Sequence, residues 1–228
     1  MIFKIVFLTC LGVSTVSSEN TKLDDLNSLI NTLDRQIQDL TSKSAFVLRP
    51  LQVALGYYAG EAHKAFISNL TVAAQPYWSA VAQAKKTVEE QGQNIDSCVK
   101  TSNSEIYATN DTFADKTNQN IKTELTAGQK ILSDIYDVAR NEPVKKLDGM
   151  HQKVKSCNKE VCAIELIEQL NKEYNELSSR VKTSLDKAND YAPKEFIKKM
   201  DQYVIVPLEY HNEIRRITAA FEMCIKKK

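Results

Sequence analysis

The sequence predicts an all-α protein: an elongated bundle of about four to six long amphipathic helices with coiled-coil-like packing, stabilised by disulfides. Glycine and proline are scarce, at 6 and 5 of 228 residues, against a usual ~7% and ~5%. This scarcity disfavours turn-rich β-sandwiches and glycine-loop nucleotide folds. Apolar residues recur at helical spacing along nearly the whole chain, and no useful stretch alternates with the period of a strand. These patterns together define the fold class.

Residues 1–18 predict a secretory signal peptide. Lys4 precedes an apolar run from Ile5 to about Val13, and Val16 and Ser18 stand at the −3 and −1 positions of a cleavage after Ser18. An uncleaved hydrophobic terminus is the alternative. No later apolar run approaches the ~20 residues of a membrane span. We therefore expect a secreted, extracellular protein without an integral membrane anchor, whose residues 19–228 form a single helical domain.

The charge balance disfavours nucleic acid as a partner. The whole chain has a formal net charge of +1. Removal of residues 1–18 takes away Lys4 alone, which leaves equal numbers of basic and acidic side chains. A neutral protein has no net field to draw it onto a phosphate backbone.

The strongest periodic signal is an apolar stripe near the start of the mature chain. Its members are spaced alternately by three and four residues, as in the a and d positions of a heptad. Such a stripe packs against another helix, either as a seam inside the bundle, which we favour, or as the contact of a homo-oligomer. The stripe consists of Leu23, Leu26, Ile30, Leu33, Ile37 and Leu40.

Helix breaks are expected near 50, 76, 101–104, 141–143 and 189–193. A proline lies at or beside four of these positions, and proline lacks the amide donor that a helix interior uses. The fifth, Thr-Ser-Asn-Ser at 101–104, is typical of a turn. A kink is expected at Pro207 and a weak point at Gly128.

The mature chain retains four cysteines, Cys98, Cys157, Cys162 and Cys224. An even number in a secreted protein predicts two disulfides, and a Cys₄ zinc site is the alternative. If the chain reverses near Tyr191, the two helices on either side would run antiparallel, with Cys224 beside Cys157. Cys224 would then pair with Cys157, and Cys98 with Cys162. Straight helices do not bring that second pair together. Either a long helix is bent or broken, at Gly128 or at Cys157-Asn158, or the pairing differs.

Two further features concern the surface and the interior. Asn69-Leu70-Thr71 and Asn110-Asp111-Thr112 are N-glycosylation sequons, which predict a glycoprotein with Asn69 and Asn110 facing water. The densest aromatic cluster is interleaved with small residues, so it could line an apolar pocket between helices, although simple core packing is the alternative. The candidate pocket residues are Tyr57, Phe66, Tyr77 and Trp78.

No pattern in the sequence points to catalysis. The three histidines, His63, His151 and His211, form no His-Glu-x-x-His pair, and there is no nucleophile elbow or phosphate-binding glycine loop. We expect a protein that is not an enzyme and that needs no cofactor or metal.

The cysteine distribution carries a family resemblance. The stretch Ile95-Asp96-Ser97-Cys98, followed by Cys157, Cys162 and Cys224 in a helical secreted chain, resembles the insect secreted tsetse EP-protein domain family. Glu-Pro occurs once, at Glu142-Pro143, so the repeat tail of that family is missing. The resemblance implies an extracellular protein and carries over no catalytic residue.

The function expected from the sequence is that of a secreted, non-enzymatic helical protein. It would act by binding, or as a structural component of an extracellular fluid. The alternative is a carrier that holds a small apolar ligand or lipid between its helices. Its partner would be an unknown protein or an apolar ligand.

Overall fold

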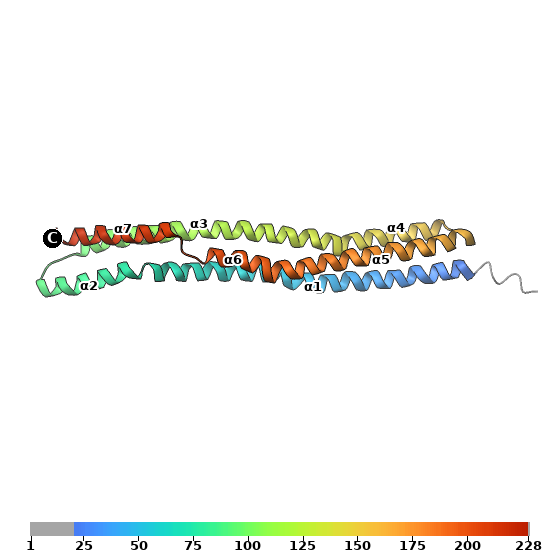
Figure 1. Cartoon of the computed structure of the whole chain (residues 1–228), viewed down its shortest axis with the longest axis horizontal. Coiled ribbons are helices and arrows are strands. Elements are labelled where there is room, and N and C mark those ends of the chain that lie inside the picture. Colours follow the sequence, from blue (N-terminus) through green and yellow to red (C-terminus); the bar gives the residue numbers. More distant parts are fainter. Residues whose placement is uncertain (1–20, 228) are drawn as a thin grey trace, which may run out of the picture. The chain divides into compact units, whose positions relative to one another are not determined.

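The computed structural model describes residues 21–227, which are helical almost throughout (Figure 1). No strand occurs in this range, so the all-α prediction is confirmed. The predicted signal peptide lies outside the described residues. In chain order the elements, with η for a π-helix, are α1 (Thr21–Ala73), α2 (Gln75–Gln91), α3 (Asp96–Tyr136), η1 (Asp137–Asn141), α4 (Glu142–Ser156), α5 (Glu160–Asp190), η2 (Tyr191–Phe196), α6 (Ile197–Tyr203) and α7 (Leu208–Ile225).

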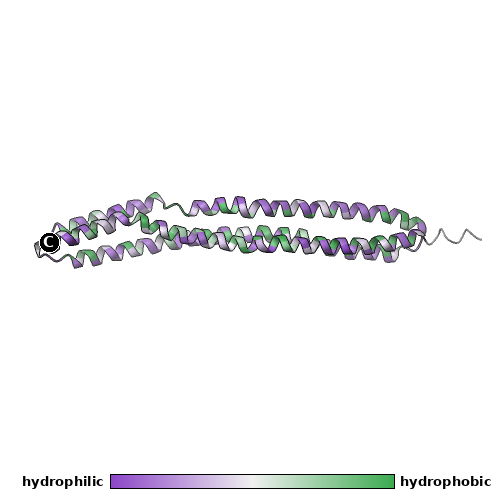
Figure 2. Ribbon diagram, turned by 90° about the horizontal axis from the view of Figure 1, so that it is seen from below, coloured by the Kyte–Doolittle hydropathy of each residue, from purple (hydrophilic) through white to green (hydrophobic). Residues whose placement is uncertain are grey.

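Three of these helices are long: α1 has 53 residues, α3 has 41 and α5 has 31. Apolar and polar residues alternate around them, as the green and purple of Figure 2 show. Within residues 21–227 the structure has seven α-helical and two π-helical segments. The expected count of four to six helices is therefore not confirmed.

Helix α1 runs through Pro50, so the break expected there is wrong. The proline lies on the exposed side of the helix, while Leu48 and Leu55, on the opposite side, are both 0% exposed. Proline in a helix interior costs ~3 kcal/mol. Burial of each leucine contributes about 1.5–3 kcal/mol, which offsets that cost.

The break expected at 101–104 is also wrong, because these residues lie inside α3. Ser102 is buried, and the Ser104 hydroxyl donates a hydrogen bond of 3.0 Å to the Lys100 main-chain oxygen one turn earlier. The hydroxyl is thus satisfied along the helix rather than by a turn. Gly128 also lies inside α3.

The breaks expected at 141–143 and 189–193 are π-helical turns within continuous helix. Segment η1 ends at Asn141, directly before α4, which carries Pro143 in its first turn. Segment η2 contains Pro193 and leads without interruption into α6. A π turn inserts one extra residue into a helix, so the missing proline amide is accommodated without ending the helix.

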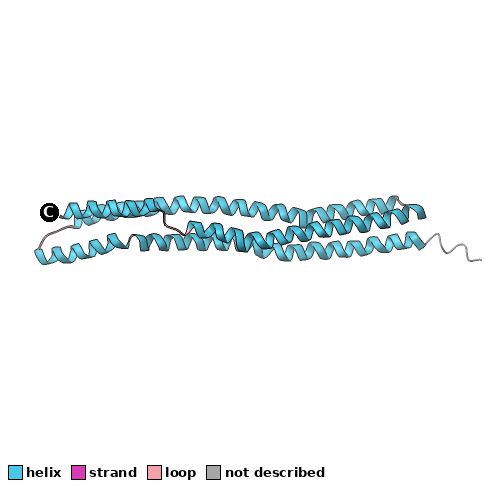
Figure 3. Cartoon of the chain, in the orientation of Figure 1, coloured by secondary structure: helices cyan, strands magenta, loops and turns pink. Residues whose placement is uncertain are grey.

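The chain leaves the helical conformation elsewhere, at the short loops of Figure 3. The break near 76 is confirmed, since α1 ends at Ala73 and α2 begins at Gln75. The kink at Pro207 is a full break between α6 and α7. The connection at residues 92–95, where Gly92 has φ 68°, was not among the expected breaks. Glycine adopts positive φ at no steric cost. The connection at residues 157–159 falls at Cys157-Asn158, a break that the cysteine spacing leaves as an alternative.

The chain divides into two compact units. The described part of unit 1 comprises residues 21–46 and Tyr136–Leu185. The predicted stripe is buried within it: Leu26, Ile30, Leu33 and Ile37 are at most 5% exposed, and Leu23 and Leu40 are half-buried. Because the chain itself covers these side chains, pairing of two copies through them would require unit 1 to open.

Unit 2 comprises Val47–Ile135 and residues 186–227. Its core is a cluster of aromatic and aliphatic side chains from α1, α2, α3 and α7. Gly128 is buried in this unit, where a Cβ atom would meet the Tyr191 hydroxyl at 3.0 Å and Leu55 Cδ1 at 3.2 Å. Gly128, which was expected to be a weak point of the helix, is therefore a position where neighbouring side chains pack closely against the helix backbone. The aromatic, leucine and isoleucine members of the core cluster are Phe66, Leu70, Tyr77, Ile95, Ile106, Tyr210, Ile214, Ile217 and Phe221.

Each unit contains one disulfide. Cys98 pairs with Cys224 in unit 2, with Cα atoms 5.9 Å apart. Cys157 pairs with Cys162 in unit 1, with Cα atoms 5.8 Å apart. The pairing of Cys224 with Cys157 is wrong, because it assumed a reversal near Tyr191, where the helix continues. Cys157 and Cys162 instead flank the turn between α4 and α5.

Candidate functional site: a cleft between α2 and α7

Of the four aromatic residues predicted to line a pocket, three meet in the core of unit 2 and the fourth, Tyr57, lies apart from them. Tyr57 lies on the surface of α1 and is 63% exposed. Phe66 and Tyr77 are buried in the core cluster of unit 2, and Trp78 packs against that cluster. The Tyr77 ring meets Trp78 and Phe221 edge-on. Three of the four residues therefore follow the core-packing alternative.

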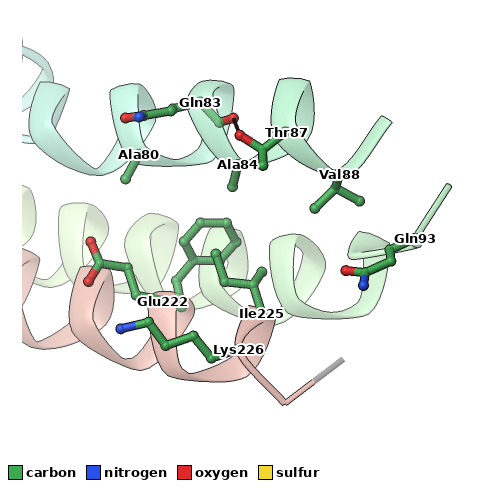
Figure 4. A pocket seen from close by; sticks show the side chains of 10 residues that line it. Ala80, Gln83, Ala84, Thr87, Val88, Gln93, Glu222, Ile225 and Lys226 are labelled. Atoms are coloured by element: carbon green, nitrogen blue, oxygen red, sulfur yellow. Dashed lines mark hydrogen bonds between the residues drawn. The ribbon is translucent and has the colours of Figure 1, made fainter. Parts of the chain in front are cut away.

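A cleft lies instead between α2 and α7, within unit 2 (Figure 4). Ala80, Ala84, Thr87 and Val88 fall at spacings of three and four residues, which place them on one face of α2. The side chains of Ala80 and Ala84 point toward α7 in Figure 4 and are too short to fill the space between the helices. The small residues of α2 thus create the opening.

The opposite wall comes from the last two turns of α7. Phe221 is 0% exposed, and Ile225 packs against the same core cluster. Gln93 lines one end of the cleft, from the connection that begins at Gly92. The cleft has a volume of 370 Å³, is open to solvent, and has a lining that is more apolar than polar.

Five of the ten residues that line the cleft are polar. Apart from Thr87, they are Gln83, Gln93, Glu222 and Lys226. The Thr87 hydroxyl is used within its own helix, where it donates to the Gln83 main-chain oxygen at 3.2 Å. Glu222 and Lys226 make no ion pair with another described residue. The cleft therefore combines apolar side chains with two amides and with two opposite charges, one helical turn apart, that form no ion pair.

The Cys98–Cys224 disulfide joins this wall to α3. Cys224 lies between Glu222 and Ile225 in the sequence, so its turn carries three of the lining residues. Its partner, Cys98, is buried in the first turn of α3. The bond thus ties the last turn of α7 to the core of unit 2.

The two predicted glycosylation residues have different surroundings. Asn69 is exposed, and its side-chain amide donates to the Val204 main-chain oxygen at 2.8 Å. Asn110 is half-buried, and its side-chain oxygen accepts a hydrogen bond of 2.6 Å from the Tyr210 hydroxyl. Burial raises the pKa of Tyr210 to about 12.

The histidines are placed apart from the cleft. His63 is half-buried on α1, and its Nδ1 atom has no hydrogen-bond partner among the described residues. His151 Nε2 lies 3.7 Å from Asp34 Oδ2 within unit 1. His211 is exposed and lines a second cleft, of 450 Å³, beside Ala73 and Ile214. Residues 21–227 hold no cluster of three or more His, Cys, Asp or Glu side chains that could bind a metal ion.

None of the helices in the described range has the length and apolar character needed to cross a membrane. Comparison with protein-family models, with curated proteins and with solved structures finds no match to this chain. The resemblance to the tsetse EP-protein domain family therefore stays a prediction.

Sequence reasoning did not find the cleft residues. A signal was present in Gly92-Gln93-Asn94, since glycine beside polar residues marks a turn. A turn there reverses the chain after α2 and allows a later helix to pack beside it. The contribution of α7 has no comparable local signal, because it depends on which helices become neighbours.

Proposed function

We propose that the protein is an exported, non-enzymatic binding protein, and that the cleft between α2 and α7 holds a small molecule with an apolar body and a polar end. The observation that carries the proposal is the gathering of apolar side chains in this cleft, Ala80, Ala84, Val88, Phe221 and Ile225, beside polar side chains that make no ion pair. Binding sites for small molecules are typically apolar concavities with a few placed polar groups, of about 300–1,000 Å³. The cleft, at 370 Å³, lies at the lower end of that range.

Two observations support export. The leader-like residues 1–18 predict secretion, and all four remaining cysteines lie in pairs at disulfide distance. Disulfides persist in oxidising environments and are rare in the cytosol. The exported protein is expected to begin at Glu19 and to carry a glycan at the exposed Asn69.

Lys226 and Gln93 give the cleft donors for an anionic end on the ligand, while Glu222 balances the charge of Lys226. Lys226 lies at the end of α7. The main chain at this end of a helix presents carbonyl oxygens and a negative partial charge, so donors for an anion must come from side chains. The Lys226 ammonium group, together with the Gln93 amide, would supply donors to a carboxylate. Glu222 lines the cleft one turn earlier on α7 and would lie nearer the ligand's apolar body.

The test is isothermal titration calorimetry, in which sodium decanoate is titrated into the full mature chain. Ala80→Phe places a ring in the cleft and is expected to weaken binding about tenfold, equivalent to ~1.4 kcal/mol. Ala82→Phe is the matched control, because Ala82 lies on α2 but is exposed and does not line the cleft. Equal binding by the two variants, or no binding by the unaltered protein, would contradict the proposal.

A second experiment tests the contact between Lys226 and the carboxylate end of the ligand. Lys226→Gln is expected to weaken decanoate binding by roughly two- to fivefold, the range for an exposed ion pair. Lys86→Gln removes the same charge from an exposed position outside the cleft and is expected to leave binding unchanged. If both substitutions act alike, the effect comes from general charge.

A further inference from the structure

We infer that the Cys98–Cys224 disulfide makes ligand binding depend on oxidation, because it holds the α7 wall of the cleft in place; the inference rests on the function proposed for that cleft. Four of the ten lining residues come from the end of α7: Phe221, Glu222 and Ile225 lie in its last two turns, and Lys226 directly follows it. Cys224 is in the middle of this set. These residues line the cleft only while the end of α7 stays helical, so a contact that fixes this end is needed.

Besides the disulfide, the last turn of α7 is held mainly by half-buried Ile225, which packs against the core cluster. Phe221 is the last fully buried residue, and beyond it Met223 is 58% exposed while Lys226 and Lys227 are exposed. The closing main-chain hydrogen bonds are long: Lys226 N to Glu222 O and Lys227 N to Cys224 O are each 3.3 Å. Helix ends open locally at low free-energy cost unless other contacts hold them. The disulfide to buried Cys98 is such a contact.

Loss of the Cys98–Cys224 disulfide would lower the affinity for the ligand by reducing the fraction of molecules in which the end of α7 is folded against the cleft. The apparent dissociation constant of a site equals its intrinsic value divided by the fraction of molecules in which the site is formed. If the last turn is formed about one tenth of the time after reduction, the apparent dissociation constant rises about tenfold. Phe221 and the earlier residues of α7 stay packed, so the rest of unit 2 keeps its fold.

The chemical step is reduction by a dithiol. A thiolate of the dithiol attacks one sulfur of the disulfide, which breaks the protein S–S bond and forms a mixed disulfide. The second thiol of the reagent then displaces the protein sulfur, so that the reagent becomes a cyclic disulfide and the protein gains two thiols. Cys224 is half-buried, whereas Cys98 is 1% exposed, so the attack takes place at the Cys224 sulfur.

The second disulfide provides an internal control. Cys157 and Cys162 are five residues apart and join the ends of α4 and α5 in unit 1. All ten residues that line the cleft belong to unit 2. Removal of this bond is therefore expected to leave the cleft intact.

The experiment compares two double variants of the mature chain, Cys98→Ser with Cys224→Ser and Cys157→Ser with Cys162→Ser. Decanoate binding is measured by calorimetry, and amide hydrogen exchange is measured over α7. The first variant is expected to bind about tenfold more weakly and to lose amide protection over residues 222–227 but not over Ile214–Phe221. The second is expected to match the unaltered protein in both measurements.

Three outcomes would overturn the inference. The first is a folded Cys98→Ser, Cys224→Ser variant with unchanged affinity and unchanged exchange over residues 222–227. The second is equal loss of protection along the whole of α7, which would make the disulfide a support of unit 2 rather than of the wall. The third is a loss of affinity caused equally by the Cys157→Ser, Cys162→Ser variant. Failure of the unaltered protein to bind decanoate contradicts the proposed function, while the exchange data still decide the role of the disulfide.

Discussion

The Tyr210 hydroxyl donates a hydrogen bond of 2.6 Å to the Asn110 side-chain oxygen, and it also reaches the Leu70 main-chain oxygen at 3.1 Å. The bond joins α7 to α3 and α1 inside unit 2, where Tyr210 is fully buried. Tyr191 is almost as buried, at 6% exposed, yet its hydroxyl has no hydrogen-bond partner among the described residues. Two tyrosines of similar burial thus differ in whether the hydroxyl is satisfied.

This difference predicts opposite effects of the same substitution. Tyr210→Phe removes a satisfied hydroxyl and is expected to lower the free energy of unfolding by about 1–2 kcal/mol. Tyr191→Phe removes an unsatisfied hydroxyl that packs among Leu55, Gly128 and Phe196. It is expected to raise the free energy of unfolding by about 1 kcal/mol. Urea denaturation of each variant measures both values.

The control for this pair is Tyr107→Phe, since Tyr107 is 56% exposed. A change within ±0.5 kcal/mol is expected for a surface substitution of this kind. If Tyr191→Phe destabilises the protein as much as Tyr210→Phe does, the assignment of an unsatisfied hydroxyl to Tyr191 is wrong.

The buried Tyr210 also predicts a loss of stability at high pH. Burial raises its pKa in the folded protein from 10.0 to about 12. A group whose folded pKa is raised contributes stability that is fully present below the unfolded pKa and is lost as the pH rises through the folded value. The contribution is therefore complete below pH 10 and declines between pH 10 and about 12.

Unfolding measured across this pH range should show the decline in the unaltered protein. Other groups also titrate there, so the informative quantity is the difference from Tyr210→Phe, which lacks the contribution. A difference that is constant from below pH 10 to about 12 would show that Tyr210 ionises normally in the folded state.

Gly128→Ala is expected to destabilise unit 2. A Cβ atom at this position would lie 3.0 Å from the Tyr191 hydroxyl, 3.2 Å from Leu55 Cδ1 and 3.3 Å from Phe196 Cδ2. Overpacking costs about 1–3 kcal/mol and alanine gains ~1 kcal/mol over glycine in a helix, so the expected net loss is up to about 2 kcal/mol.

Gly149→Ala provides the contrast, because a Cβ atom at Gly149 in α4 meets nothing within 4 Å. This variant is expected to be more stable by about 0.5–1 kcal/mol. Thermal unfolding of the two variants should therefore move in opposite directions. Stabilisation by both substitutions would mean that Gly128 is not tightly packed.

The helical class and the buried stripe could be predicted from the sequence because both depend on local spacing. Leu26 and Ile37, for example, are buried where the heptad places them. The helix ends were less predictable. Pro50 is a strong local signal for a break, but the burial of Leu48 and Leu55 on the opposite face outweighs it. Propensity is a weak prior that tertiary packing overrides.

The cleft could not be predicted for a related reason. Ala80 and Ala84 line an opening only because α7 lies opposite them, and this neighbour is separated from them by more than 100 residues. The aromatic cluster at Tyr57 and Trp78 was the more visible signal. It marks the packed interior of unit 2 and the surface of α1, because large apolar side chains fill space that a ligand would need.

The two disulfides are expected to contribute unequally to stability. In the chain-entropy description, the contribution of a disulfide grows with the length of the loop that it closes. Cys98 and Cys224 are 126 residues apart, and Cys157 and Cys162 are five apart. The first bond is then worth about 5 kcal/mol and the second about 2 kcal/mol. Urea denaturation of the two double serine variants should show a larger loss for Cys98→Ser with Cys224→Ser, and equal losses would mean that both loops are already constrained in the unfolded chain.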